Sequence, residues 1–522
     1  MATLGRAAKI VALLLGFYLL CLLLLVGMVV LDVFAFKLLF GTTNAGWHAP
    51  KLALVLLAAT VGIFIVVVRG LFVSVRVRRK DLTGIPVGPA DQPELWRRVN
   101  ALAEVVGTRP PAEIRLVPEV NAAVLEHAHL MGLLPGKRRM MVGVPLMQAL
   151  TVPELEAVLA HELGHYSDRH SRLAPLAGRA RAGVMAAMQA VSKQVGKSGK
   201  FQWPGSQIYA ELFRAYAILV LKQTFAISRE QEYAADRIAA TAGGRENAAS
   251  ALRKLPATDA AYDLYLNEFI GRGLARKLAP PPVEVLGGFG EFLADPERAK
   301  QMAKFDDADD EQEAHAFDSH PPIPDRIAAI MALPDDGRAP APAADGPPTR
   351  AFALLANPYA VLTALGQQML REHVAGAQIA DWETIARTAR IGSAQENSQP
   401  IVHLVSTMIG RPARFTDFLA LVEAGRLPEI LDRMDHTETA RKLNVPPPAQ
   451  REFKKNALGR MLAAWAVFEL VPSGRATIRH SWSGFGGEMQ LAGGQEKTLG
   501  EGVEALLTMW PDTALIRQVV PA

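Results

Sequence analysis

The chain has 522 residues, with 56 Lys and Arg against 52 Asp and Glu, and a single cysteine. One thiol excludes a disulfide scaffold and a four-cysteine zinc site, and it suits a reducing compartment. The net charge of +4 is unevenly distributed, because residues 1–80 carry +8 and the remainder is mildly acidic. The basic charge therefore lies in the most apolar segment of the chain, and we expect no nucleic-acid partner.

Residues 1–80 are predicted to form a two-helix membrane hairpin. Apolar runs cover about residues 10–31 and 52–73, and at about 1.5 Å per residue they approach the thickness of a hydrocarbon core of about 30 Å. The basic residues lie mainly outside the short loop between the runs, which places both termini and the following domain in the cytoplasm. We therefore expect a multi-pass protein of the inner membrane with two spans. A cleaved signal peptide fits less well, because the first run is longer than usual and a second run follows.

The rest of the chain is expected to form a mainly α protein of the α+β class. Residues 81–334 mix helical periodicity with short β-like runs such as Ile114–Val117, which predicts helices with a small sheet. Residues 335–350 are rich in Pro, Ala and Gly and are expected to form an extended linker. Residues 351–522 are expected to form a mostly helical C-terminal domain with one hairpin around 476–491.

A metal-binding helix is predicted from Thr151 onward. Thr151 and Glu154 form a capping-box pattern, so the helix begins there. On this helix His161 and His165 are one turn apart on the same face, where two imidazoles can converge on one ion. Glu162 follows the first histidine, so that its carboxylate can reach a water on the metal rather than the metal itself. The alternative is a pair of surface histidines joined by hydrogen bonds.

A third ligand is expected from the segment 228–237, Ser-Arg-Glu-Gln-Glu-Tyr-Ala-Ala-Asp-Arg. On a second helix, Glu232 and Asp236 share a face. One carboxylate can complete a site of two histidines and one acid, and the other can hold a ligand histidine in place. An ordinary charged helix face is the alternative interpretation of this segment by itself.

These motifs resemble those of HtpX-like and CAAX-prenyl-protease-type zinc endopeptidases, which are membrane-bound gluzincins. The resemblance covers about residues 90–335 and rests on four segments in the same order. They are Asn121-Ala122-Ala123 with the strand-like run 139–144, the metal helix 157–165, the helix 228–236, and Ser319-His320-Pro321-Pro322 followed by Arg326-Ile327.

The resemblance implies one Zn²⁺ per chain, with His161, His165 and Glu232 as ligands and Asp236 as the brace of a ligand histidine. It further implies that Glu162 is the general base, that His320 stabilises the oxyanion, and that Asn121 and Ala122 bind substrate backbone. Two departures stand out. Ala123 replaces the phenylalanine of the family pattern, and the region between the two metal helices is too polar for two further spans.

The expected function is a membrane-anchored zinc endopeptidase that hydrolyses peptide bonds with a metal-activated water. Its expected partners are the lipid bilayer and peptide or protein substrates, among them unfolded or membrane proteins, which suggests membrane-protein quality control. Two alternatives remain: a catalytically silent membrane scaffold stabilised by zinc, and a prenyl-protein processing protease. The sequence predicts neither the oligomeric state nor the role of residues 351–522.

Overall fold

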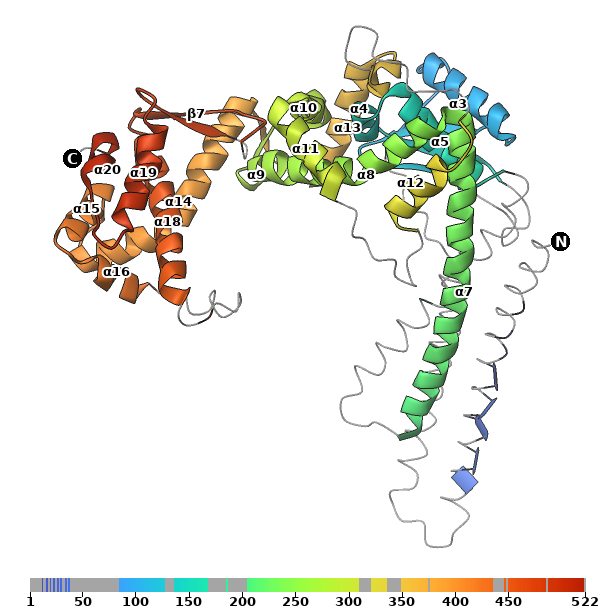
Figure 1. The fold of residues 1–522 in the computed structure, drawn as a ribbon, viewed down its shortest axis with the longest axis horizontal. Helices are drawn as coiled ribbons and strands as arrows, with labels where there is room; N and C mark the ends of the chain where they lie inside the picture. The colour runs from blue at the N-terminus through green and yellow to red at the C-terminus, as the bar shows by residue number, and fades with distance from the viewer. Residues whose placement is uncertain are drawn as a thin grey trace. The chain divides into compact units, whose positions relative to one another are not determined.

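The structure is a computed structural model. It describes residues 84–126, 136–167, 204–308, 321–335, 349–373, 376–434, 449–484 and 487–520, together with isolated positions, several of them helical between 12 and 37. The contacts divide the chain into two compact units. Unit 1 comprises Met1–Thr258 and Phe305–Pro358, and unit 2 comprises Asp259–Lys304 and Tyr359–Ala522. Figure 1 gives the element labels used below.

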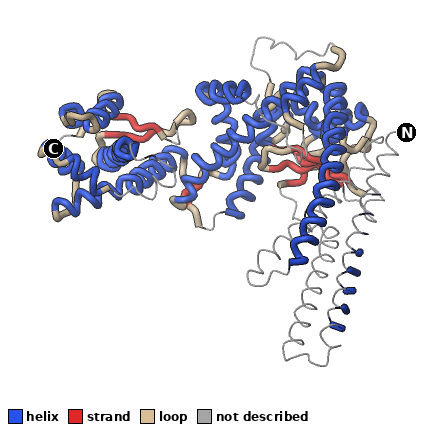
Figure 2. Tube along the Cα trace, turned by 60° about the horizontal axis from the view of Figure 1, so that its bottom comes forward, coloured by secondary structure: helices blue, strands red, loops and turns tan. Residues whose placement is uncertain are grey.

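Unit 1 contains a four-stranded sheet of mixed direction, drawn in red in Figure 2. The strand order is β1-β2-β4-β3, in which β2 and β4 are parallel and the other two pairs are antiparallel. Alternate residues of the two central strands are fully buried, which is the two-residue period of a sheet with one covered face. The strands are β1 (Ile85–Val87), β2 (Glu113–Val117), β3 (Ala122–Glu126) and β4 (Arg138–Gly143).

The helices of unit 1 begin and end at residues that suit those positions. Helix α5 begins with the predicted capping box, since the Thr151 N–H donates to Glu154 at 2.8 Å and the Glu154 N–H donates to the Thr151 hydroxyl at 3.5 Å. Helix α3 ends at Gly107, whose φ of 72° favours glycine. The elements are α3 (Pro93–Val106), α4 (Val144–Ala149), α5 (Val152–Gly164), α7 (Pro204–Gly243), α8 (Arg245–Tyr265), α12 (Ile323–Met331) and the 3₁₀ turn η3 (Ala351–Leu354). The last residues of α8, from Asp259, belong to unit 2.

Helices α5 and α7 pack side by side, and this contact builds the site described below (Figure 1). Their approach is close because Gly243, at the end of α7, lies directly against Ala157 of α5. A Cβ at position 243 would lie 2.8 Å from the Ala157 Cβ, closer than real Cβ atoms come. Glycine is therefore the residue that allows these two backbones to meet.

Unit 2 is mostly helical and has its own hydrophobic core. Trp465, Phe415 and Phe418 are at the centre of that core, each 1% exposed or less, and their rings lie 5.5–6.4 Å apart. The elements are the π-helical segment η2 (Leu266–Gly271), α9 (Arg272–Ala275), β5 (Leu278–Ala279), α10 (Pro282–Ala294), α11 (Pro296–Ala308), α13 (Pro358–His373), β6 (Gln378–Ile379), α14 (Trp382–Ile409), α15 (Phe415–Glu423), α16 (Leu427–Arg433), α18 (Gln450–Leu470), β7 (Ala476–Arg479), β8 (Glu488–Leu491), α19 (Glu496–Leu506) and α20 (Ala514–Val519).

The expectation of a mainly α protein with a small sheet is confirmed, and so is the hairpin around 476–491, which β7 and β8 form. The predicted span 52–73 and most of the linker 335–350 lie outside the described residues, as does much of the span 10–31. Within the described part of the chain, no helix is both long enough and apolar enough to cross a bilayer. Residues 259–304 pack with the C-terminal segment, and the domain boundaries expected from the sequence stay predictions.

Candidate metal centre

Helix α5 presents His161 and His165 as the spacing predicts. Leu155, Leu159 and Leu163 are 2% exposed or less and fix the apolar side of the helix in the core. The two histidine rings lie on another face, and their Nε2 atoms are 3.2 Å apart. The ring planes are nearly perpendicular, so the two imidazoles meet edge to face instead of stacking. The helix therefore delivers two nitrogen ligands to one point.

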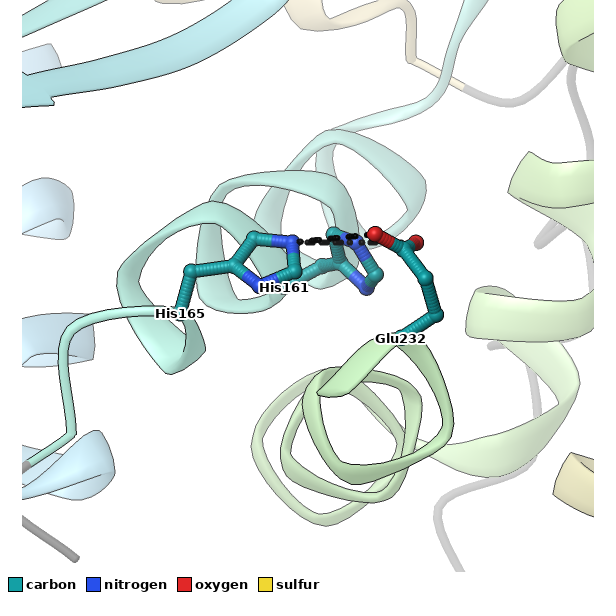
Figure 3. Close-up of side chains that lie close together, drawn as sticks. All are labelled: His161, His165 and Glu232. Carbon is teal, nitrogen blue, oxygen red and sulfur yellow. Dashed lines mark hydrogen bonds and ion pairs between the residues drawn. The ribbon is translucent and has the colours of Figure 1, made fainter. Parts of the chain in front are cut away.

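Glu232 reaches the same position from helix α7 (Figure 3). Its carboxylate oxygens lie 3.5 Å from His161 Nε2 and 3.7 Å from His165 Nε2. One ligand atom from each of the three side chains falls within 4.8 Å of the others. Two segments far apart in the sequence thus meet at one cluster of nitrogen and oxygen donors.

The spacing of these donors fits a tetrahedral zinc ion. Zinc binds histidine nitrogen and carboxylate oxygen at about 2.0–2.2 Å, and two ligands of a tetrahedron with that radius are roughly 3.3–3.6 Å apart. The two Nε2 atoms are 3.2 Å apart, Glu232 Oε2 lies 3.5 Å from His161 Nε2, and Glu232 Oε1 lies 3.7 Å from His165 Nε2, all close to that value. Two imidazoles and one carboxylate are also the ligand set of a catalytic zinc site, which keeps its fourth position open.

Asp236 and Arg326 hold this cluster from behind. Asp236 Oδ1 lies 3.0 Å from His161 Nδ1, so the opposite ring nitrogen, Nε2, faces the donor cluster. Arg326 donates two hydrogen bonds to the Asp236 carboxylate, at 2.6 and 2.8 Å, and one of its nitrogens is 3.4 Å from Glu232. All three charged side chains are less than 10% exposed. The Arg326 guanidinium therefore links Asp236, which orients His161, to Glu232, which belongs to the donor cluster.

The electrostatics of the cluster favour one positive charge, on His161. Burial by itself lowers the pKa of His161, but hydrogen bonds to Asp236 and Glu232 outweigh it and raise the pKa to about 9. Burial and the neighbouring His161 lower the pKa of His165 to about 4. Burial raises the pKa of Asp236, yet its contacts with Arg326 and His161 leave that pKa below the usual value. A proton on His161 or a divalent cation can supply the charge, and cation binding would release the proton.

The metal helix is tied to the edge of the sheet through Tyr166, the residue after His165. The Tyr166 hydroxyl donates to the Val124 carbonyl of β3 at 2.7 Å, and the Arg138 guanidinium lies 4.9 Å from the centre of the Tyr166 ring. Among the described strands, β3 pairs with β4 alone. The edge of the sheet is therefore held next to the end of the helix that carries both histidines.

The structure places most of the residues expected at the site. Asn121 is exposed at the start of β3, where its carbonyl accepts a hydrogen bond from the Gly143 N–H at 2.7 Å, and Ala122 is the first residue of that strand. Glu162 is half-buried on α5, directly after His161. His320 lies outside the described residues.

The role of Arg326 as the cation that pairs with Asp236 was not predicted from the sequence, where Arg326 is only one residue of a motif. A signal was present, since Arg326 is a lone cation within an apolar helix. On α12 it stands between Ile323, Ile327 and Ile330, which pack against the core of unit 1. An arginine on such a face must find a buried acid.

Comparison with known proteins bears on the same segment. Residues 89–333 match the family described as Peptidase family M48. Over these residues, somewhat less than half of the chain, the sequence is similar to peptidases of family M48. The M48 segment contains every described residue of the cluster. The resemblance to HtpX-like proteins expected from the motifs is thereby confirmed.

Several relatives are named "Protease HtpX homolog". That of Kineococcus radiotolerans is 28% identical over 256 residues, which cover 48% of this chain and 76% of the relative. That of Pyrococcus abyssi is 31% identical over 175 residues, which cover 32% of this chain and 58% of the relative. Among solved structures, Ste24p of S. mikatae aligns with 17% identity and a TM-score of 0.27 over 61% of this chain and 67% of that one. A likeness at that level supports no argument.

Proposed function

We propose that this M48 peptidase is a zinc-dependent endopeptidase, with His161, His165 and Glu232 as the metal ligands. The observation that carries the proposal is the convergence of these three side chains, since one ligand atom from each lies within 4.8 Å of the others. When bound, zinc supplies a Lewis acid for the scissile carbonyl and lowers the pKa of a water ligand to about 7.

The side chains of this chain have separate roles in the proposed reaction. The Glu162 carboxylate takes a proton from the water that attacks the peptide carbonyl, and then passes it to the leaving nitrogen. Asp236 keeps His161 Nδ1 protonated, so that Nε2 stays available as a ligand atom. His320 donates a hydrogen bond to the carbonyl oxygen as negative charge develops there.

The edge strand β3 is the proposed binding surface for the substrate backbone. A peptide that pairs with Ala122–Glu126 would extend the sheet by one strand. Its scissile bond would then lie beside helix α5, whose end is fixed next to β3 by the Tyr166 hydrogen bond. Asn121, exposed at the start of this strand, would hydrogen-bond to the peptide backbone. Such pairing requires an extended chain, which favours unfolded or flexible substrates.

The proposed setting is the cytoplasmic face of the inner membrane. Residues 1–80 would form the anchor with spans at about 10–31 and 52–73, and both termini would lie in the cytoplasm. The accessible substrates would be misfolded chains and the flexible segments of neighbouring membrane proteins. This setting suits a role in the quality control of membrane proteins.

A single substitution tests the proposal. The Glu162→Gln variant keeps the three ligands and loses the base, so it should bind about one zinc per chain and lose cleavage of unfolded casein by a factor of about 10² or more. Glu104→Gln, at an exposed position of α3, is the matched control and should cleave casein at the wild-type rate. If Glu162→Gln cleaves casein as fast as the wild type, the proposed base is wrong. If the wild type binds no zinc, the whole assignment is wrong.

A further inference from the structure

Strand β3 presents a row of backbone groups at the free edge of the sheet, and their direction follows from its pairing with β4. The Asn121 carbonyl accepts a hydrogen bond from the Gly143 N–H of β4 at 2.7 Å. Because successive residues of a paired strand direct their backbone groups to opposite sides, Ala122, Val124 and Glu126 face away from β4. These three residues therefore provide the N–H and C=O groups with which an added strand could pair.

The Tyr166 side chain occupies the second half of this row. Its hydroxyl donates to the Val124 carbonyl at 2.7 Å. Burial raises the pKa of this hydroxyl, and a hydrogen bond with the Glu126 backbone acts in the opposite direction. A backbone group that favours the ionised form of a phenol is a donor, so the Glu126 N–H is directed at the same oxygen. The hydroxyl thus contacts an acceptor and a donor of the edge strand, as a residue of a neighbouring strand would.

The position of Tyr166 is fixed by contacts with its main chain and with its ring. Its carbonyl accepts a hydrogen bond from the Thr108 hydroxyl at 2.8 Å. The buried Arg138 guanidinium lies 4.9 Å from the centre of the ring and donates to the Thr108 hydroxyl oxygen at 2.7 Å. Arg138 Nε is also 3.7 Å from the Glu126 carboxylate. A ring held in this way delivers its hydroxyl to the edge of the sheet in a defined position.

The first half of the row is open to a peptide. Within the described residues, the outward-facing N–H and C=O of Ala122 make no hydrogen bond. A carbonyl oxygen can accept two hydrogen bonds, but a peptide N–H that approaches Val124 must share that oxygen with a hydroxyl fixed 2.7 Å from it. A peptide paired at Ala122 therefore gains little by extending its pairing past Val124.

We propose that Tyr166 determines where substrate pairing on β3 ends. A bound peptide pairs with the backbone of Ala122 and leaves the strand at Val124, next to the helix end that carries His165. The inference rests on the proposed binding of substrate backbone along β3, and it narrows that binding to the start of the strand. An enzyme of this kind needs only a short extended stretch of chain, such as a loop or a terminus.

Binding of modified peptides tests the proposal on the full chain in detergent. The probe is the tightest-binding of a set of overlapping, fluorescein-labelled casein peptides. Fluorescence anisotropy measures its affinity in the Glu162→Gln background, so that cleavage does not interfere. Each peptide amide in turn is replaced by an ester, which removes one N–H and leaves the shape of the chain nearly unchanged. One ester should weaken binding by about 2- to 10-fold, because it removes the bond to the Ala122 carbonyl.

The Tyr166→Phe variant should create a second sensitive position in the peptide. This variant keeps the ring and removes the hydroxyl, so the Val124 carbonyl becomes available to a peptide N–H. The ester two residues from the first should weaken binding by about 2- to 10-fold in Tyr166→Phe, and it should have no effect when Tyr166 is present. Tyr359→Phe, at a position of unit 2 that is 68% exposed, is the matched control and should leave the pattern of sensitive positions unchanged.

Four results would overturn the proposal. They are binding of none of the casein peptides, a second sensitive position while Tyr166 is present, no new sensitive position in Tyr166→Phe, and a uniform loss of affinity across the series in that variant, which would show a structural role. The zinc chemistry is tested separately, because these measurements depend on binding alone. A wild type that binds no zinc or cleaves no casein, but shows the expected binding pattern, would contradict the proposed reaction and support the role of Tyr166.

Discussion

Replacement of Arg326 by methionine should destabilise unit 1, because it leaves the buried Asp236 carboxylate without its cation. The Arg326 side chain is 9% exposed, that of Asp236 is 3% exposed, and two hydrogen bonds of 2.6 and 2.8 Å join them. Loss of one partner of such a pair costs about 3–5 kcal/mol in the free energy of unfolding. In a cooperative unit of this size each kcal/mol lowers the melting temperature by about 2–4 °C, so we expect a fall of roughly 6–20 °C.

Zinc affinity should fall in the same variant. Asp236 orients His161, and a mutation that removes the support of a ligand histidine typically weakens metal binding by about 10- to 100-fold. Thermal unfolding of the full chain in detergent and zinc competition against a chelating dye measure the two effects. Arg237→Met, which removes an exposed arginine next to Asp236 on α7, is the matched control and should change neither quantity.

The double variant Asp236→Asn with Arg326→Met distinguishes loss of the Arg326–Asp236 ion pair from a general loss of packing as the cause of the lower stability. Removal of the negative charge as well should recover part of the lost stability, since the remaining site has no uncompensated carboxylate at that position. A melting temperature of Arg326→Met within about 2 °C of the wild type, with unchanged zinc affinity, would refute the reasoning. Additive effects of the two substitutions would refute the coupling.

Two further predictions concern the contacts that hold the metal helix. Burial raises the pKa of Glu154, but hydrogen bonds from Lys254, Ser250 and the Thr151 backbone outweigh it and lower the pKa below 4.5. Glu154→Gln should lower the free energy of unfolding by about 1.5–3 kcal/mol at pH 7. In denaturant titrations the difference between variant and wild type should shrink as the pH falls below 4.5 toward the pKa of Glu154 in the folded state. A difference independent of pH would contradict this prediction. Gly243→Ala should cost about 1–3 kcal/mol, because the new methyl group meets Ala157 at 2.8 Å. Wild-type stability in Gly243→Ala would show that α5 and α7 separate easily.

The local parts of the site could be predicted from the sequence because they depend on one helix. The capping box gives the start of α5, and the four-residue spacing brings His161 and His165 to one face, as the structure shows. The segment 228–237 could be named as the source of a third ligand, but the choice of Glu232 over Asp236 required a resemblance, since both carboxylates share one helix face. The contact depends on a glycine against an alanine, Gly243 on Ala157, and nothing in either local pattern marks these two residues as partners.

Other features of the structure depend on contacts between residues far apart in the sequence, which no local sequence pattern predicts. Glu154 was expected only as a capping residue, yet its carboxylate also accepts hydrogen bonds from Ser250 and Lys254 of α8. The π-helical turn that carries Phe269 arises within a sequence that reads as ordinary helix. Such features follow from tertiary packing, which overrides local propensity.

The order of the cluster along the chain has a consequence for biosynthesis. His161, Glu232 and Arg326 follow one another over a long stretch of sequence, and the last of them closes the set of buried contacts. At about 5–20 residues per second, a ribosome needs roughly ten seconds or more to pass from the first to the last. During that time the two histidines exist without the completed framework. The buried contacts around the donor cluster therefore cannot be complete until Arg326 has left the ribosome.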